Sequence, residues 1–142
     1  MNRPNCILLV DDEAQVRAAL AMMLGLDGHR VTEAENAQEA LRLFSSGQFD
    51  MVITDFAMPD MKGNELAARI KRLSPSQKVV MITGHEKRLG RADNPVDAIL
   101  EKPFGLEELR ELLARLSAPA AKGRPRDGRR KSGSSPQARR PS

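Results

Sequence analysis

Short, almost continuous apolar runs alternate along the chain with segments in which apolar residues recur every three or four positions. The runs lie at residues 6–10, 51–54, 79–83 and 98–100, with a weaker one at 30–34. Runs of this length and composition predict β-strands. Because most of them lack polar alternation, they are typical of a parallel sheet that is covered on both faces.

The segments between the runs have the spacing of amphipathic helices. Their predicted buried stripes are Val16, Leu20 and Met23; Ala37, Leu41 and Phe44; Leu66, Ile70 and Leu73; and Leu106, Leu109, Leu113 and Leu116. Gly25 and Gly28 mark the end of the first helix, and Asn36 with Glu39 resembles a capping box at the start of the second. Strict alternation of strand and helix predicts βαβ units and a doubly wound α/β fold.

Two segments interrupt this pattern. Residues 85–97 contain Gly90, Asn94 and Pro95 and have little apolar periodicity, which predicts a short or irregular fourth helix. Residues 118–142 are rich in Pro, Gly, Ser and Arg and have no apolar periodicity, so they cannot bury enough surface to fold. We therefore expect one domain at residues 1–117 and a disordered basic tail at residues 118–142.

Composition narrows the classes of protein. Of 142 residues, 40% are hydrophobic, which supports a single core. Residues 118–142 contain eight Lys and Arg and one Asp, a net charge of +7, while the rest contains 15 basic and 18 acidic residues, a net charge of −3. A single cysteine cannot form an internal disulfide, and no apolar stretch is long enough to span a membrane. We expect a cytoplasmic protein with no membrane partner.

Charged residues follow the predicted strands at their carboxyl ends. Asp11 and Asp12 close the first run, Asp55 closes the third, and Lys102 follows the last. Each alone could be a helix cap or a solvated charge, but parallel strands bring these ends to one edge of the sheet, where ligand sites of such folds lie. Three crowded carboxylates suit a hard cation such as Mg²⁺. A carboxylate can also attack phosphorus, with Lys102 and Thr83 available to stabilise the phosphoryl oxygens.

Four motifs, in order, resemble those of the receiver domain of two-component response regulators. They are LVDDE at residues 9–13, ITDFAMPDMKG at 53–63, MITG at 81–84 and EKPF at 101–104. The resemblance covers roughly residues 5–117. It implies a flavodoxin-like five-stranded parallel sheet with the strand order 2-1-3-4-5.

The resemblance also implies roles for individual residues. Asp55 would accept a phosphoryl group from the phosphohistidine of a sensor histidine kinase or a histidine phosphotransfer protein. Asp12, Asp55 and the backbone carbonyl of Ala57 would bind Mg²⁺ directly, and Asp11 would hold it through water. The output partner is not specified by these motifs.

Further roles concern the phosphoryl group itself. The resemblance implies that Lys102 pairs with the phosphoryl oxygens, that the Thr83 hydroxyl moves to bind them as the switch, and that the Lys102–Pro103 bond is cis. His85, two residues after Thr83, is either a modulator of dephosphorylation or a surface polar residue. Many receivers have Tyr or Phe three residues before the lysine, where this chain has Ile99, so we expect phosphoacceptance to be kept and the relay of the signal to differ.

The leading hypothesis is a stand-alone response regulator that signals by phosphorylation-dependent protein contact or by phosphorelay, and that is not an enzyme acting on an outside substrate. Alternatives are a receiver fragment of a hybrid sensor kinase, a phosphorylation-independent scaffold, and a nucleic-acid-binding protein acting through its tail, which is not favoured over a solvated tail. Phosphatases of the haloacid dehalogenase type also use an aspartyl nucleophile, but they place a second acid where this chain has Ala57.

Overall fold

The fold is a five-stranded parallel sheet with helices on both faces. The computed structural model describes residues 5–84 and 95–117. The strands are β1 (Cys6–Val10), β2 (Arg30–Ala34), β3 (Met51–Asp55), β4 (Lys78–Thr83) and β5 (Ala98–Glu101). Within the described residues the helices are α1 (Ala14–Leu26), α2 (Ala37–Ser46), α3 (Gly63–Leu73) and α4 (Leu106–Ser117). All neighbouring strands pair in parallel, and their order is β2-β1-β3-β4-β5.

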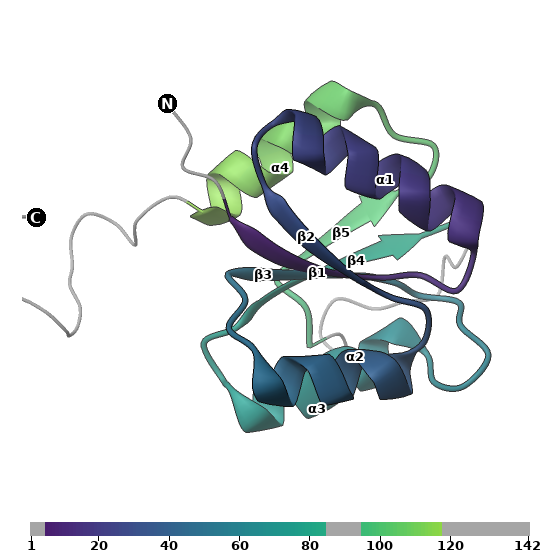
Figure 1. The fold of residues 1–142 in the computed structure, drawn as a ribbon, viewed down its shortest axis with the longest axis vertical. Helices are drawn as coiled ribbons and strands as arrows, with labels where there is room; N and C mark the ends of the chain where they lie inside the picture. Colours follow the sequence, from purple (N-terminus) through teal and green to yellow (C-terminus); the bar gives the residue numbers. More distant parts are fainter. Residues whose placement is uncertain (1–4, 85–94, 118–142) are drawn as a thin grey trace, which may run out of the picture.

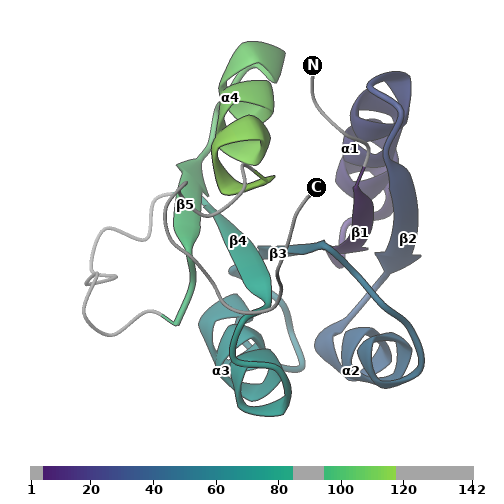
Figure 2. The same cartoon turned by 90° about the vertical axis from the view of Figure 1, so that its left-hand side faces the viewer.

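The helices form two layers around the sheet. Helices α1 and α4 cover one face, and α2 and α3 cover the other (Figures 1 and 2). The predicted doubly wound fold and its strand order are therefore confirmed. The predicted irregular fourth helix and the predicted tail fall largely or wholly on residues 85–94 and 118–142, which lie outside the described residues. In the described ranges, no helix is long and apolar enough to cross a bilayer.

Alternation along the strands divides the core in two. Ile7 and Leu9 of β1 belong to the cluster that contains residues of α1 and α4, whereas Leu8 and Val10 belong to the cluster with α2 and α3. Every residue of β3 is buried, as expected for the central strand of a sheet covered on both faces. Strand β2 has only Ala34 buried, which explains its weak sequence signal, because an edge strand needs fewer apolar residues.

The helix ends follow the predicted punctuation. After α1, the Gly28 N–H donates to Gly25 O at 2.9 Å and the His29 N–H to Leu24 O at 3.2 Å. This is a Schellman motif, and the φ of 88° at Gly28 is the left-handed conformation that it requires. At the start of α2, the Asn36 side chain accepts from the Glu39 N–H at 2.7 Å, which confirms Asn36 as the cap. The Glu39 carboxylate accepts from the Glu35 N–H at 3.0 Å instead of the Asn36 N–H, so the return bond of a capping box is shifted by one residue.

Candidate functional site

The predicted site residues meet at the carboxyl edge of the sheet. Asp11 and Asp12 follow β1, Asp55 is the last residue of β3, Thr83 is the last of β4, and Lys102 comes directly after β5. The strand register sets Asp55 opposite Ile82, one residue before Thr83. The backbone N–H of Lys102 in turn donates to Thr83 O at 2.8 Å. The parallel sheet thus gathers residues that are up to 91 positions apart in the sequence.

Asp11, Asp12 and Asp55 form a compact group of carboxylates. Each of the three offers an oxygen that lies within 4.8 Å of the others. Asp11 is 1% exposed and Asp55 is 6% exposed, while Asp12 faces solvent. Two of the carboxylates are therefore largely cut off from water, where charges are costly.

Lys102 supplies one positive charge to this group. Its Nζ lies 3.3 Å from Asp55 Oδ1. Burial raises the pKa of the Asp55 carboxyl, and the charge of Asp11 raises it further, so that the opposing effect of Lys102 is outweighed. Burial likewise raises the pKa of Asp11, against the Glu13 backbone N–H and Lys102. One lysine therefore does not balance the carboxylates that surround it.

The arrangement fits a divalent cation. Glu13 N–H donates to Asp11 Oδ1 at 2.9 Å, but the buried Asp11 Oδ2 has no hydrogen-bond partner. An orphaned carboxylate oxygen in a group of uncompensated acids is the environment in which Mg²⁺ binds, through carboxylates and retained water. Asp11, Asp12 and Asp55 are thus the residues that fit the ion.

The other residues named in the sequence analysis differ in exposure and in their position around the site. Thr83 is 4% exposed, and Ala57 is an exposed residue of the loop between β3 and α3. The Lys102–Pro103 bond is cis, as the resemblance implied. Ile99 lies on β5 with 38% of its surface exposed. His85 lies outside the described residues, so its predicted influence on dephosphorylation stays a prediction.

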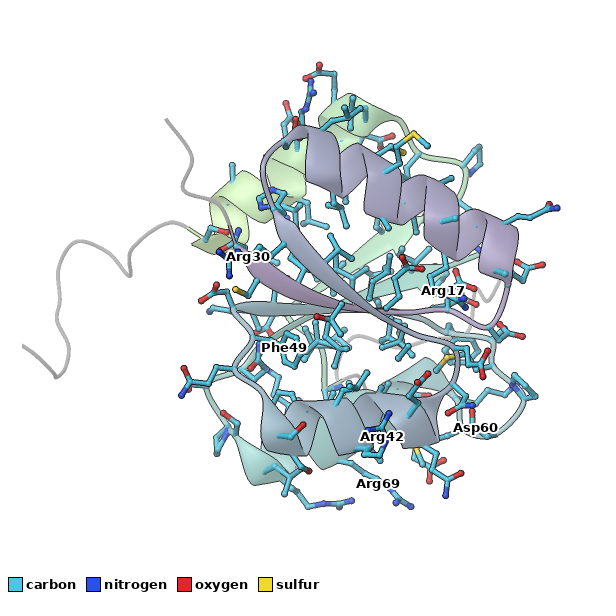
Figure 3. The ribbon with its side chains drawn as sticks, in the orientation of Figure 1. Arg17, Arg30, Arg42, Phe49, Asp60 and Arg69 are labelled. Atoms are coloured by element: carbon cyan, nitrogen blue, oxygen red, sulfur yellow. The ribbon has the colours of Figure 1, made fainter. Side chains whose placement is uncertain are left out.

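Asp60 has a contact that sequence analysis did not anticipate. Its carboxylate lies in the β3–α3 loop and accepts from two N–H groups at the start of α2, those of Ala37 at 3.3 Å and Gln38 at 3.0 Å. These groups have no partner within the helix, and the dipole of α2 favours a negative charge there. Asp60 thereby ties the loop that follows Asp55 to a second helix. Figure 3 shows it beside the start of α2.

Replacing Asp60 with alanine is expected to lower the free energy of unfolding by about 1–2 kcal/mol, because two helix N–H groups lose their acceptor. Chemical denaturation followed by circular dichroism measures the change. Glu111→Ala removes an exposed acid of α4 and is the control. A loss no larger for Asp60→Ala than for this control would contradict the assigned contact.

The sequence was compared with protein families and with known proteins. Residues 7–114 match the family described as the response regulator receiver domain. The chain is 36% identical over 121 residues to the phosphate regulon transcriptional regulatory protein PhoB of Pseudomonas aeruginosa, covering 79% of this chain and 50% of PhoB. It is 34% identical over 114 residues to the autoinducer 1 sensor kinase/phosphatase LuxN of Vibrio campbellii, covering 79% of this chain and 13% of LuxN. The chain thus spans half or less of these two proteins.

Solved structures agree in fold. The response regulator TrrA of Thermotoga maritima, in complex with Mg²⁺–BeF, superposes with a TM-score of 0.73 at 34% identity, over 78% of this chain and 96% of that one. The chemotaxis protein CheY4 of Vibrio cholerae gives a TM-score of 0.72 at 29% identity, over 80% of this chain and 99% of that one. Both likenesses extend over nearly the whole of the matched structure.

Proposed function

Because this chain belongs to the response regulator receiver family, we propose that its function is to take a phosphoryl group onto Asp55. The donor is the phosphohistidine of a sensor histidine kinase or of a histidine phosphotransfer protein. The observation that carries the proposal is the grouping of Asp55 with Asp11, Asp12 and Lys102 at one sheet edge. An arrangement that leaves carboxylates short of positive charge favours an added cation and, with it, phosphate chemistry.

In the proposed reaction an Asp55 carboxylate oxygen attacks the phosphorus, the bond from phosphorus to the histidine nitrogen breaks, and an acyl phosphate forms on Asp55. Bound Mg²⁺ would offset the negative charge of the carboxylates and of the phosphoryl oxygens. Asp11, Asp12, Asp55 and the Ala57 carbonyl are proposed to hold the ion. Lys102, whose Nζ lies 3.3 Å from Asp55 Oδ1, is proposed to pair with a phosphoryl oxygen, and the Thr83 hydroxyl is proposed to donate to another.

The output that we propose is a phosphorylation-dependent protein contact or a further phosphotransfer, in the cytoplasm, rather than turnover of an outside substrate. The match to the sensor kinase/phosphatase LuxN favours one alternative, a receiver that works as part of a hybrid sensor kinase. The two differ in what surrounds the receiver, whereas the chemistry at Asp55 is the same in both.

The test is the intact mass of the protein after incubation with acetyl phosphate. We expect one added phosphoryl group, labile to base, on the wild type in the presence of Mg²⁺. Excess chelator and Asp55→Asn should each abolish it, because the first removes the cation and the second the nucleophile. A mass unchanged under every condition would overturn phosphoacceptance and favour a scaffold that binds partners without phosphorylation. Addition that persists in Asp55→Asn would assign the reaction to another residue.

A further inference from the structure

Arg17 turns its guanidinium back from α1 toward the end of β1. Its Nη1 donates to the backbone carbonyl of Asp11 at 2.7 Å, and its Nε pairs with Glu33 Oε1 of β2 at 3.0 Å. The Arg17 side chain is only 16% exposed. Figure 3 shows it beneath α1, whereas Arg42 of α2 and Arg69 of α3 are exposed. This arginine therefore joins one helix and two strands at the edge of the sheet that carries the site.

The Asp11 residue is held from three directions. Its N–H donates to Ala34 O of β2 at 3.1 Å, its carbonyl accepts from Arg17, and its Oδ1 accepts from the Glu13 N–H. The Asp11 Oδ2 atom is left for another partner. Because Asp12 follows directly, the conformation of this short turn sets where both carboxylates lie relative to Asp55. Removal of the Arg17 contact frees the turn at its carbonyl.

We infer that Arg17 is a positioning residue for Mg²⁺ binding, which acts by fixing the Asp11–Asp12 turn through the Asp11 carbonyl. The inference rests on the proposed function, since it takes the ion of the site to be Mg²⁺. Residues that orient metal ligands without touching the metal typically change its affinity 10–100-fold when they are replaced. The Arg17–Glu33 pair would orient Asp11 in this way without touching the metal. Glu33 holds the Arg17 guanidinium in place, and the guanidinium in turn holds the Asp11 carbonyl.

The direction in which Mg²⁺ affinity changes when Arg17 is replaced distinguishes a positioning role from a purely electrostatic one. A positive guanidinium near a cation site repels the cation, so on Coulomb grounds alone its removal would tighten Mg²⁺ binding. Positioning predicts the opposite. A purely structural role predicts a third result, a lower free energy of unfolding with an unchanged dissociation constant for Mg²⁺.

The experiment is calorimetric titration of the full 142-residue chain with MgCl₂ after removal of metal, at a temperature where circular dichroism shows each variant folded. Arg17→Gln and Arg17→Lys are compared with the wild type. Lysine keeps the charge but cannot bind two acceptors as the guanidinium fork does. Arg42→Gln is the control, because Arg42 is 69% exposed and lies 3.6 Å from Glu39 on α2.

We expect the dissociation constant for Mg²⁺ to rise about tenfold in both Arg17 variants and to stay within about twofold of the wild type in Arg42→Gln. An unchanged or lower constant in the Arg17 variants would overturn the inference. If Arg17→Gln does not fold, the Lys variant decides alone. A wild type that binds no Mg²⁺ would instead overturn the proposed function, so the two failures are distinct.

Discussion

Replacement of Gly63 with alanine is expected to lower the free energy of unfolding by about 3 kcal/mol. Gly63 is the first residue of α3, and a Cβ built there would overlap the backbone carbonyl oxygen of Asp55 and approach the Phe56 Cα at 3.0 Å. Both neighbours are backbone atoms, one in the last residue of β3 and one in the residue after it, so neither can rotate away as a side chain could. The Gly63 N–H also donates to Phe56 O at 2.8 Å, which fixes the distance between the two segments.

The direction of this change is informative, because alanine normally stabilises a helix relative to glycine by up to about 1 kcal/mol. Gly25 of α1 has nothing within 4 Å of its built Cβ, so Gly25→Ala is the matched control and should be neutral or stabilising. Urea denaturation of both variants measures the two effects. A Gly63→Ala variant as stable as the wild type would show that the β3–α3 loop can yield, and that the close approach does not constrain Asp55.

Replacement of Asp55 with asparagine is expected to raise the free energy of unfolding by about 1 kcal/mol when metal is chelated at pH 7. The ionised carboxylate is unfavourable in the folded protein, because burial and the charge of Asp11 raise its pKa above the ordinary value of 3.8. The substitution also removes the ion pair with Lys102. The stability lost in this way is smaller than the stability gained, because Lys102 is about one-third exposed and such pairs contribute little. Denaturation in excess chelator measures the difference.

The pH dependence has a definite sign. A raised pKa means that the folded state binds the proton more tightly than the unfolded state, so the wild type loses stability as pH rises from about 4 through the raised pKa of Asp55. The stability advantage of Asp55→Asn should therefore shrink as pH falls toward 4.

Saturating Mg²⁺ should stabilise the wild type more than the variant, since ligands stabilise the state that binds them. Equal stability of the two proteins in chelator at pH 7 would contradict the crowding of carboxylates, and Glu111→Gln is the neutral control.

The fold was predictable because its signals are local and periodic. Every strand coincided with an apolar run to within one residue at each end, as with β3, which continues through Asp55. The cap at Asn36 and the Schellman glycine at Gly28 depend on neighbours a few residues away. The edge strand β2 gave the weakest signal, because only one of its residues is buried. Burial on one or both faces thus decided how clearly each strand appeared in the sequence.

The site was predictable only in part. Asp11, Asp12, Asp55 and Lys102 could be brought together because parallel strands share an edge. The contacts of Arg17 with Asp11 O and of Asp60 with the start of α2 could not be predicted from the sequence pattern. Each joins a side chain to backbone atoms whose position depends on the folded loops, and neither residue interrupts a periodic pattern. Hydrogen bonds of this kind can be recognised only in the folded structure.

The position of Asp55 also bears on how the molecule fluctuates. Asp55 ends the central strand β3, which pairs with β1 on one side and β4 on the other and is buried along its whole length. Local unfolding begins where backbone hydrogen bonds are exposed, which here means the edge strands β2 and β5. Amide hydrogens of β3 are then among the last to exchange with solvent. The proposed phosphoacceptor therefore keeps its backbone frame in partly opened forms of the protein, whereas Lys102, which follows the edge strand β5, lies in a part that opens more easily.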